Sequence, residues 1–272
     1  TGKKWLFCRE AESDTRYVVC NADEGEPGTF KDRVLLQCHA DALFEGMTLC
    51  AYGIGAKKGF LYLRGEYRYL LGHLQAVLRR RYDSGLLGAS ILGQAGFSFD
   101  IEIVIGAGAY ICGEESALIE SLEGKPGIPR IRPPFPVTHG YLGRPTVVNN
   151  VETFIAATHI VQYGSAGFSA VGTEKSSGSK LLSVSGDCRT PGIYEYPYGV
   201  SIQQVLDDCG ATQVQAVQIG GPAGSLLAKK DFNRQISFED VSTGGSFLVF
   251  GENRDLLSIN RNFARFFAHE SC

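Results

Sequence analysis

The sequence predicts an α/β fold, with a parallel sheet covered by helices on both faces and a smaller β-rich module after it. Short apolar runs alternate, over the first 165 residues, with stretches whose apolar positions have helical spacing. This alternation is typical of parallel strands joined by crossover helices. The predicted strands are residues 17–20, 59–63, 100–105 and 146–148, and the predicted helices are residues 40–52, 66–83, 116–122 and 151–163.

The second half of the chain has a different pattern. A stretch rich in glycine and serine, residues 164–179, indicates a linker. The order strand, strand, helix, strand that follows resembles a β-grasp (ubiquitin-like) module, and its helix is expected to begin at the N-cap Ser201. The predicted strands are residues 180–185, 192–196, 215–219 and 245–250, and a last helix is predicted from residue 254.

Composition excludes several classes of function. The net charge is −3 and no basic cluster is present, which disfavours nucleic-acid binding. The longest apolar run, residues 103–113, is shorter than the roughly 20 residues that span a bilayer, so no membrane insertion is expected. The 8 cysteines form no C-x-x-C pair, and we interpret them as small buried residues of a cytoplasmic protein. The 5 histidines show no metal-ligand spacing.

An acidic turn, residues 21–28, follows the first predicted strand. Its carboxylates, Asp23, Glu24 and Glu26, lie at the carboxyl end of the sheet, where open α/β folds bind ligands. They could accept hydrogen bonds from sugar hydroxyls or ring N–H groups. The alternative is a solvated turn that caps a helix.

A glycine-rich turn, residues 106–116, follows the third predicted strand. It matches neither G-x-G-x-x-G nor a P-loop, because Ile111 replaces a required glycine and Glu114 and Glu115 replace Lys-Ser/Thr. Two carboxylates would repel a triphosphate, which argues against a P-loop hydrolase. The glycines are expected to make room for a flat ring or a sugar; a tight packing turn is the alternative.

Two further segments complete the candidate site. Prolines stiffen residues 130–136, so that Phe135 is either held out to stack on a planar base or buried in the core. At the end of the fourth predicted strand, Asn149 and Glu152 fit a capping box. The amide of Asn150 is then left for a ligand.

Together these segments resemble the family of NADH-oxidising flavoprotein subunits found in complex I and its soluble relatives. The resemblance is carried by NADEGEPGTFKDR (21–33), GAGAYICGEESALIESLEGKPG (106–127), RPPFP (132–136) and PTVVNNVET (145–153). It implies a Rossmann-like FMN/NADH-binding domain at residues 1–165, a β-grasp domain at 178–251 and the start of a helical [4Fe-4S] domain at 252–272. The branch most resembled is the diaphorase subunit of NAD-reducing [NiFe]-hydrogenase.

The resemblance also implies roles for single residues. Phe135 would stack on adenine, and Glu26 would accept the ribose hydroxyls and repel the extra phosphate of NADPH. Cys272 would be the first ligand of a [4Fe-4S] cluster. FMN would be lined by Asn21, Asp23, Glu24, Tyr110, Gly113, Glu114, Asn149 and Asn150, and NADH would be faced by Glu26, Glu115, Arg132 and Phe135.

The implied function is hydride transfer between NADH and FMN with one-electron relay to iron–sulfur clusters. The expected partners are other subunits of a soluble NAD-linked hydrogenase or dehydrogenase, including an iron–sulfur subunit. Alternatives are the corresponding subunit of NAD-dependent formate dehydrogenase or of complex I, or a non-enzymatic docking module. The family's G-R-G-G-A-G-F-P loop and its remaining cluster cysteines are expected outside this sequence. The chain alone is therefore expected to hold neither FMN tightly nor the cluster.

Overall fold

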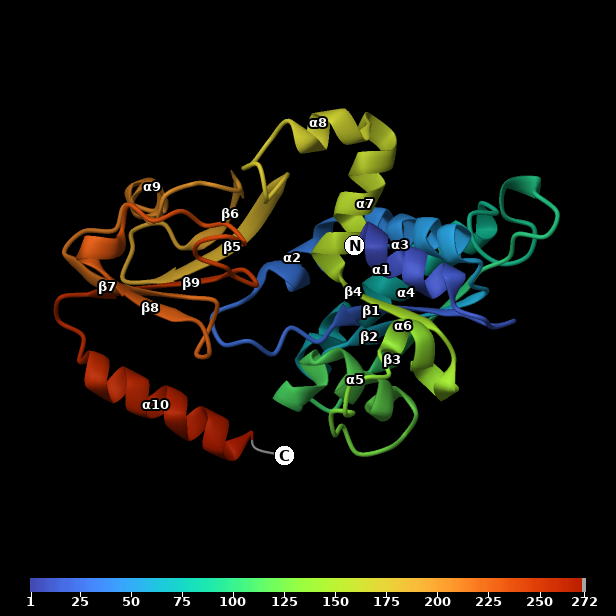
Figure 1. The fold of residues 1–272 in the computed structure, drawn as a ribbon, viewed down its shortest axis with the longest axis horizontal. Helices are drawn as coiled ribbons and strands as arrows, with labels where there is room; N and C mark the ends of the chain where they lie inside the picture. The colour runs from blue at the N-terminus through green and yellow to red at the C-terminus, as the bar shows by residue number, and fades with distance from the viewer. Residues whose placement is uncertain (271–272) are drawn as a thin grey trace. The chain divides into compact units, whose positions relative to one another are not determined.

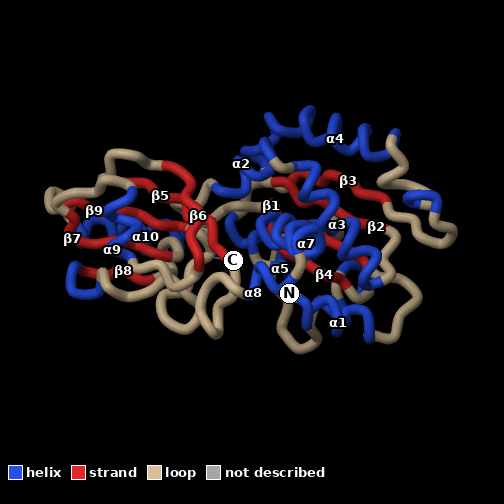
Figure 2. Tube along the Cα trace, turned by 90° about the horizontal axis from the view of Figure 1, so that it is seen from above, coloured by secondary structure: helices blue, strands red, loops and turns tan. Residues whose placement is uncertain are grey.

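The computed structural model describes residues 1–270, which form two compact units. The first unit contains residues 1–25 and 32–162, and the second contains residues 26–31 and 163–270. Each unit is built around one β-sheet, whose strands are drawn in red in Figure 2.

The first unit has a parallel sheet of four strands in the order β3-β2-β1-β4. All of their carboxyl ends therefore meet at one edge, where β1 ends next to β2 and β4. The predicted parallel α/β sheet is confirmed. The strands are β1 (Tyr17–Ala22), β2 (Lys58–Leu63), β3 (Asp100–Ile105) and β4 (Thr146–Asn150).

Helices cover both faces of this sheet (Figure 1). On one face, Val19 and Phe60 pack with Leu118 of α5, and on the other α3 lies against β1 and β2. Side chains alternate between the faces along a strand, so the consecutive buried residues of β1 and β2 require cover on both sides. The helices are α1 (Gly2–Glu10), α2 (Lys31–Cys38), α3 (Ala40–Ile54), α4 (Leu71–Asp83), α5 (Glu115–Leu122), α6 (Pro136–His139) and α7 (Val151–Tyr163).

One glycine sets the contact between α3 and α7. A Cβ atom on Gly46 would collide with the backbone carbonyl of Phe154. The absence of that atom lets the two helix backbones approach and bury the Phe154 ring, which is fully enclosed.

The second unit has a mixed sheet in the order β6-β5-β9-β7-β8. Its first and last core strands, β5 and β9, are parallel neighbours at the centre, and α9 crosses between β6 and β7. Val184, Val205 and Phe247 form part of the core. This is the arrangement that the β-grasp prediction requires. The elements are α8 (Ser165–Ser169), β5 (Ser179–Gly186), β6 (Gly192–Pro197), α9 (Ile202–Asp208), β7 (Val214–Ile219), β8 (Ser225–Ala228), β9 (Ser246–Gly251) and α10 (Leu256–His269).

The structure corrects the expected elements in several places. The segment predicted as a linker contains α8, and α1, α2, α6 and β8 were not predicted. The helix predicted at residues 66–83 begins with a 3₁₀ segment, Gly65–Leu70, before α4. Ser201 caps α9 as predicted, since its hydroxyl accepts a hydrogen bond from the Gln204 N–H at 3.1 Å.

Cysteine placement follows the composition argument. Over residues 1–270 the cysteines are free thiols, and five of these seven are buried; Cys38 is exposed. Within the same residues no helix has the length and apolar character to cross a bilayer.

Candidate functional site

The carboxyl ends of the strands in the first unit bring the predicted FMN residues together. Asn21 lies opposite Asn150 in the register of β1 and β4. The Asn21 side-chain N–H donates to the Gly113 carbonyl at 2.8 Å. A Cβ atom on Gly25 would lie 3.4 Å from the Tyr110 ring. Segments about 90 residues apart in sequence thus form one edge, as the sheet topology requires.

Asp23 is the most unusual carboxyl group at this edge. It is 6% exposed, and its Oδ2 has no hydrogen-bond partner within residues 1–270. Burial raises the pKa of Asp23 from the ordinary 3.8 to about 6, and the nearby Arg64 guanidinium opposes that rise. A buried oxygen without a partner is costly in a folded protein and is a frequent feature of binding sites.

The Glu24 carboxylate is held by the protein itself. It is 5% exposed and accepts hydrogen bonds from the Asp32 N–H at 2.9 Å and the Tyr67 hydroxyl at 2.8 Å. A longer bond of 3.4 Å comes from the Arg33 N–H. Glu24 therefore fastens the start of α2, and these bonds orient its carboxylate inward. Burial and the Glu24 charge raise the pKa of Tyr67.

Two other predicted FMN residues cap helices. The Glu114 Oε2 accepts from the N–H groups of Ser116 at 2.9 Å and Ala117 at 3.0 Å, at the start of α5. At the start of α7, the Asn150 Oδ1 accepts from the Glu152 N–H at 3.0 Å. The prediction that Asn149 is the capping residue was wrong, because β4 continues to Asn150 and the cap lies one residue later than expected.

The Asn149 amide is held by a residue that the sequence analysis missed. Its Oδ1 accepts a hydrogen bond of 2.8 Å from the Trp5 indole N–H. Trp5 lies on α1, whose apolar residues do not follow a helical stripe. The one available signal is that Trp5 is the only tryptophan in the sequence.

Replacing Trp5 with Phe keeps most apolar contacts of the ring and removes this hydrogen bond. We expect the free energy of unfolding to fall by about 1 kcal/mol, the usual net worth of one such bond. Urea denaturation followed by circular dichroism measures the change. Tyr69→Phe, which removes a polar group from an exposed ring, is the control and should have no effect. Equal stability of the two variants would contradict the structural role of the indole N–H.

A second cluster of charge involves the predicted NADH residues Glu115 and Arg132. Glu115 accepts from Lys4 Nζ at 2.6 Å and lies 3.3 Å from an Arg132 nitrogen. Lys4 also donates to the Val148 carbonyl at 2.7 Å, which ties α1 to β4. Lys4 is a second residue that the sequence analysis missed, and its position immediately before Trp5 gave no signal. Phe135 is 52% exposed, so its side chain is held out of the core.

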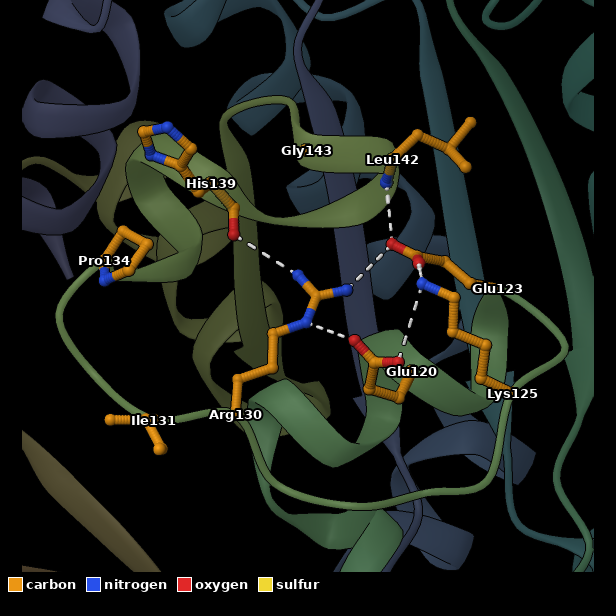
Figure 3. Close-up of a pocket in the computed structure, with 9 residues that line it drawn as sticks. All are labelled: Glu120, Glu123, Lys125, Arg130, Ile131, Pro134, His139, Leu142 and Gly143. Carbon is orange, nitrogen blue, oxygen red and sulfur yellow. Dashed lines mark hydrogen bonds and ion pairs between the residues drawn. The ribbon is translucent and has the colours of Figure 1, made fainter.

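Arg130 fixes the base of the loop that carries Arg132 and Phe135. Figure 3 shows its guanidinium between Glu120 and Glu123 of the α5 end, and it donates to the Gly140 carbonyl at 2.9 Å. These groups line a shallow hollow of about 500 Å³. Its ionic groups are already paired, and its lining differs from the predicted binding residues. We therefore assign this cluster to loop anchoring.

The glycines of the turn at residues 106–113 have different roles. A Cβ atom on Gly106 would lie 2.8 Å from the Tyr62 ring, so close packing explains this position. A Cβ atom on Gly113 would meet only the Asp23 carbonyl, at 3.4 Å. Of these two, Gly113 is the one that leaves open space beside the acidic turn.

Two predicted residues do not belong to the described residues of the first unit. Glu26 belongs to the second unit, where its side chain lies against Gly221. Cys272 lies outside the described residues. Within the described part of the chain, no three His, Cys, Asp or Glu side chains are grouped to hold a metal ion.

Comparison with known proteins identifies the first unit. A family model described as the Nuo51 FMN-binding domain matches residues 1–159. The chain belongs to the Nuo51 FMN-binding domain family. The NAD-reducing hydrogenase HoxS subunit alpha of Cupriavidus necator is 56% identical over 273 residues, covering all of this chain and 45% of that protein. An NADH-quinone oxidoreductase subunit of Rhizobium meliloti is 40% identical over 283 residues, covering 100% of this chain and 67% of that protein.

A solved structure shows the same fold at similar identity. A crystal structure of an NAD⁺-reducing [NiFe]-hydrogenase in the H₂-reduced state matches with a TM-score of 0.94 and 54% identity. The match covers 100% of this chain and 47% of that one, so this chain spans about half the length of these hydrogenase relatives. Membership of the FMN-binding family, predicted from the four segments, is confirmed.

Proposed function

We propose that this chain is the FMN- and NAD(H)-binding part of a diaphorase subunit in an NAD-reducing hydrogenase. The observation that carries the proposal is the buried Asp23 oxygen without a partner at the carboxyl edge of an FMN-binding-family sheet. The 56% identity to a hydrogenase subunit favours that complex over NADH:quinone oxidoreductase, the second candidate, whose matching Rhizobium meliloti subunit is 40% identical.

The residues at the sheet edge fit FMN. The isoalloxazine ring and the ribityl chain carry N–H and O–H donors, which suit the acceptor Asp23 Oδ2. Gly113 leaves space beside it, and Asn21 lies against the Gly113 carbonyl. We propose that Asp23, Asn21, Tyr110 and Gly113 contact the cofactor. Glu24, Glu114, Asn149 and Asn150 would complete the wall, with their side chains held by helix starts and by Trp5.

The loop at residues 130–136 provides groups suited to the nucleotide. The exposed Phe135 ring can stack on adenine, and Arg132 offers a cation for the pyrophosphate. Glu115 would orient the Arg132 guanidinium and supply an acceptor for sugar hydroxyls. When bound, FMN supplies the hydride acceptor and passes the electrons on singly. The residues of this chain bind and orient the two molecules, so no general base is required.

The proposal extends to the domain boundaries, the cluster ligand, the partners and the location of the protein. We infer domains at residues 1–165, 178–251 and 252–272, with Cys272 as the first ligand of a [4Fe-4S] cluster. The partners would be other subunits of a soluble NAD-linked complex, including an iron–sulfur subunit. A cytoplasmic location is supported by the free thiols.

Replacing Phe135 with Ala should raise the KM for NADH about tenfold with kcat nearly unchanged, because one base–aromatic stack is worth about 1–3 kcal/mol. Half of the ring is exposed, so the thermal midpoint should stay within about 2 °C. Ile131→Ala, at a 91% exposed position of the same loop, is the matched control. Steady-state kinetics on the intact enzyme measure the effect. A KM equal to that of the control would remove Phe135 from the nucleotide site.

Cofactor identity tests the proposal directly. The intact protein is desalted, the non-covalent cofactor is released with acid, and its mass is determined. We expect one FMN per chain and no FAD. A protein that carries no flavin, and binds none when FMN is added, would favour the docking-module alternative.

A further inference from the structure

The segment that carries Glu26 is built onto the sheet of the second unit. The Pro27 carbonyl accepts a hydrogen bond from the Ser246 hydroxyl of β9 at 3.2 Å. The Phe30 N–H donates to the Ser183 hydroxyl of β5 at 2.9 Å. Ser183 and Ser246 are both fully buried, so these bonds fix the segment firmly. Residues 26–31 therefore take their position from β5 and β9.

Glu26 itself lies in a space that exists only because residue 221 is glycine. A Cβ atom on Gly221 would overlap the Glu26 carboxylate and lie 2.6 Å from its Cγ. The backbone at Gly221 has little freedom to yield. Its carbonyl accepts hydrogen bonds from the buried Gln218 amide at 2.6 Å and from the Gly224 N–H at 2.9 Å.

We propose that Gly221 is a positioning residue that holds the Glu26 carboxylate where it selects NADH over NADPH. The inference rests on the proposed function and on the role that the family resemblance implies for Glu26. A carboxylate discriminates against a 2′-phosphate by repulsion, and repulsion falls with distance and is screened by water and salt. The position of the Glu26 carboxylate therefore matters, and Gly221, in the loop between β7 and β8, fixes that position.

The neighbouring glycine supplies a matched control. Gly220 has φ +82° and Gly221 has φ +71°, so alanine is strained in the left-handed region at either position. A Cβ atom on Gly220 would meet no atom closer than 3.4 Å, the Ser242 carbonyl. Gly220→Ala thus imposes the backbone strain alone, whereas Gly221→Ala also displaces Glu26. The displaced group is the end of a flexible side chain, so the fold can accommodate the change.

The test uses the intact, FMN-loaded enzyme with Gly221→Ala, Gly220→Ala, Glu26→Gln and the double variant of positions 26 and 221. Two quantities are measured: the ratio of kcat/KM for NADH over NADPH, and by calorimetry the ratio of Kd for 2′-phospho-ADP-ribose over ADP-ribose. Glu26→Gln should lower both ratios about tenfold, and Gly221→Ala should lower them about threefold or more. Gly220→Ala should leave them unchanged, and the double variant should equal Glu26→Gln.

The outcomes distinguish a failure of the role of Gly221 from a failure of the role of Glu26. If Glu26→Gln changes neither ratio, the role of Glu26 fails and the inference fails with it. If Glu26→Gln lowers the ratios but Gly221→Ala behaves like Gly220→Ala, the inference alone is overturned. Should Gly221→Ala not fold, Glu26→Asp decides: it keeps the charge but withdraws it from Gly221. We expect Glu26→Asp to lower both ratios, and wild-type ratios would overturn the proposal.

Discussion

Replacing Asp23 with Asn should stabilise the flavin-free protein at pH 7 and weaken its binding of FMN. Burial raises the pKa of the Asp23 carboxyl from 3.8 to about 6, so above pH 6 the folded protein holds a charge that water would solvate better. A shift of about two units corresponds to about 3 kcal/mol, the upper limit of the gain in free energy of unfolding.

The pH dependence gives the sign of the effect. Between pH 4 and pH 6 the folded protein keeps the Asp23 proton and the unfolded chain loses it, so the wild type loses stability as the pH rises through this range. The Asn variant lacks that slope, and the two proteins converge near pH 4. Urea denaturation followed by Trp5 fluorescence measures both curves in the first unit. A variant less stable than the wild type at pH 7 would contradict the assignment.

FMN binding should move in the opposite direction. A hydrogen bond to a charged acceptor is worth about 1.5–3 kcal/mol, so the Asn variant should bind FMN about tenfold more weakly. Quenching of flavin fluorescence measures the Kd. A stabilising substitution that costs binding is typical of a group kept for its ligand. An unchanged Kd would mean that Asp23 does not contact the cofactor.

Replacing Glu24 with Ala should lower the free energy of unfolding by about 3–5 kcal/mol, because buried donors lose their charged acceptor together. The N–H groups of Asp32 and Arg33 and the hydroxyl of Tyr67 lose their partner. Urea denaturation at pH 7 measures the loss. Glu24→Gln keeps the shape and one acceptor oxygen, and should cost less than half as much. A loss below about 1 kcal/mol for the Ala variant would refute the anchoring role.

The sheet of the first unit could be predicted because its central strands, β1 and β2, are buried on both faces. Residues 100–105 and helix 151–163 were predicted with the bounds that the structure has. Helix α1 was missed because its apolar residues do not form a stripe, and its contacts with β4 are polar, through Lys4 and Trp5. Helix α2 was missed because its start is bonded by Glu24, seven residues before it, rather than by an adjacent cap.

The location of the site could be predicted from the sequence, but the role of each side chain in it could not. The order of strands and turns predicted that Asn21, Asp23 and Gly113 lie at the carboxyl edge of the first sheet. Spacing does not say which side-chain oxygens the protein itself uses: Asn150 caps α7 in place of Asn149, and Asn149 accepts a hydrogen bond from Trp5. Asp23 differs from Glu24 only through tertiary contacts: one carboxylate is bonded to α2 and the other keeps an oxygen without a partner.

The central proposal is that the intact protein containing this chain holds an FMN that exchanges hydride with NADH. An anaerobic titration of the intact protein, followed by its visible spectrum, tests this most directly. We expect a flavin band at about 450 nm that bleaches with stoichiometric NADH and hardly responds to NADPH. A bound flavin whose spectrum stays unchanged with excess NADH would contradict the account.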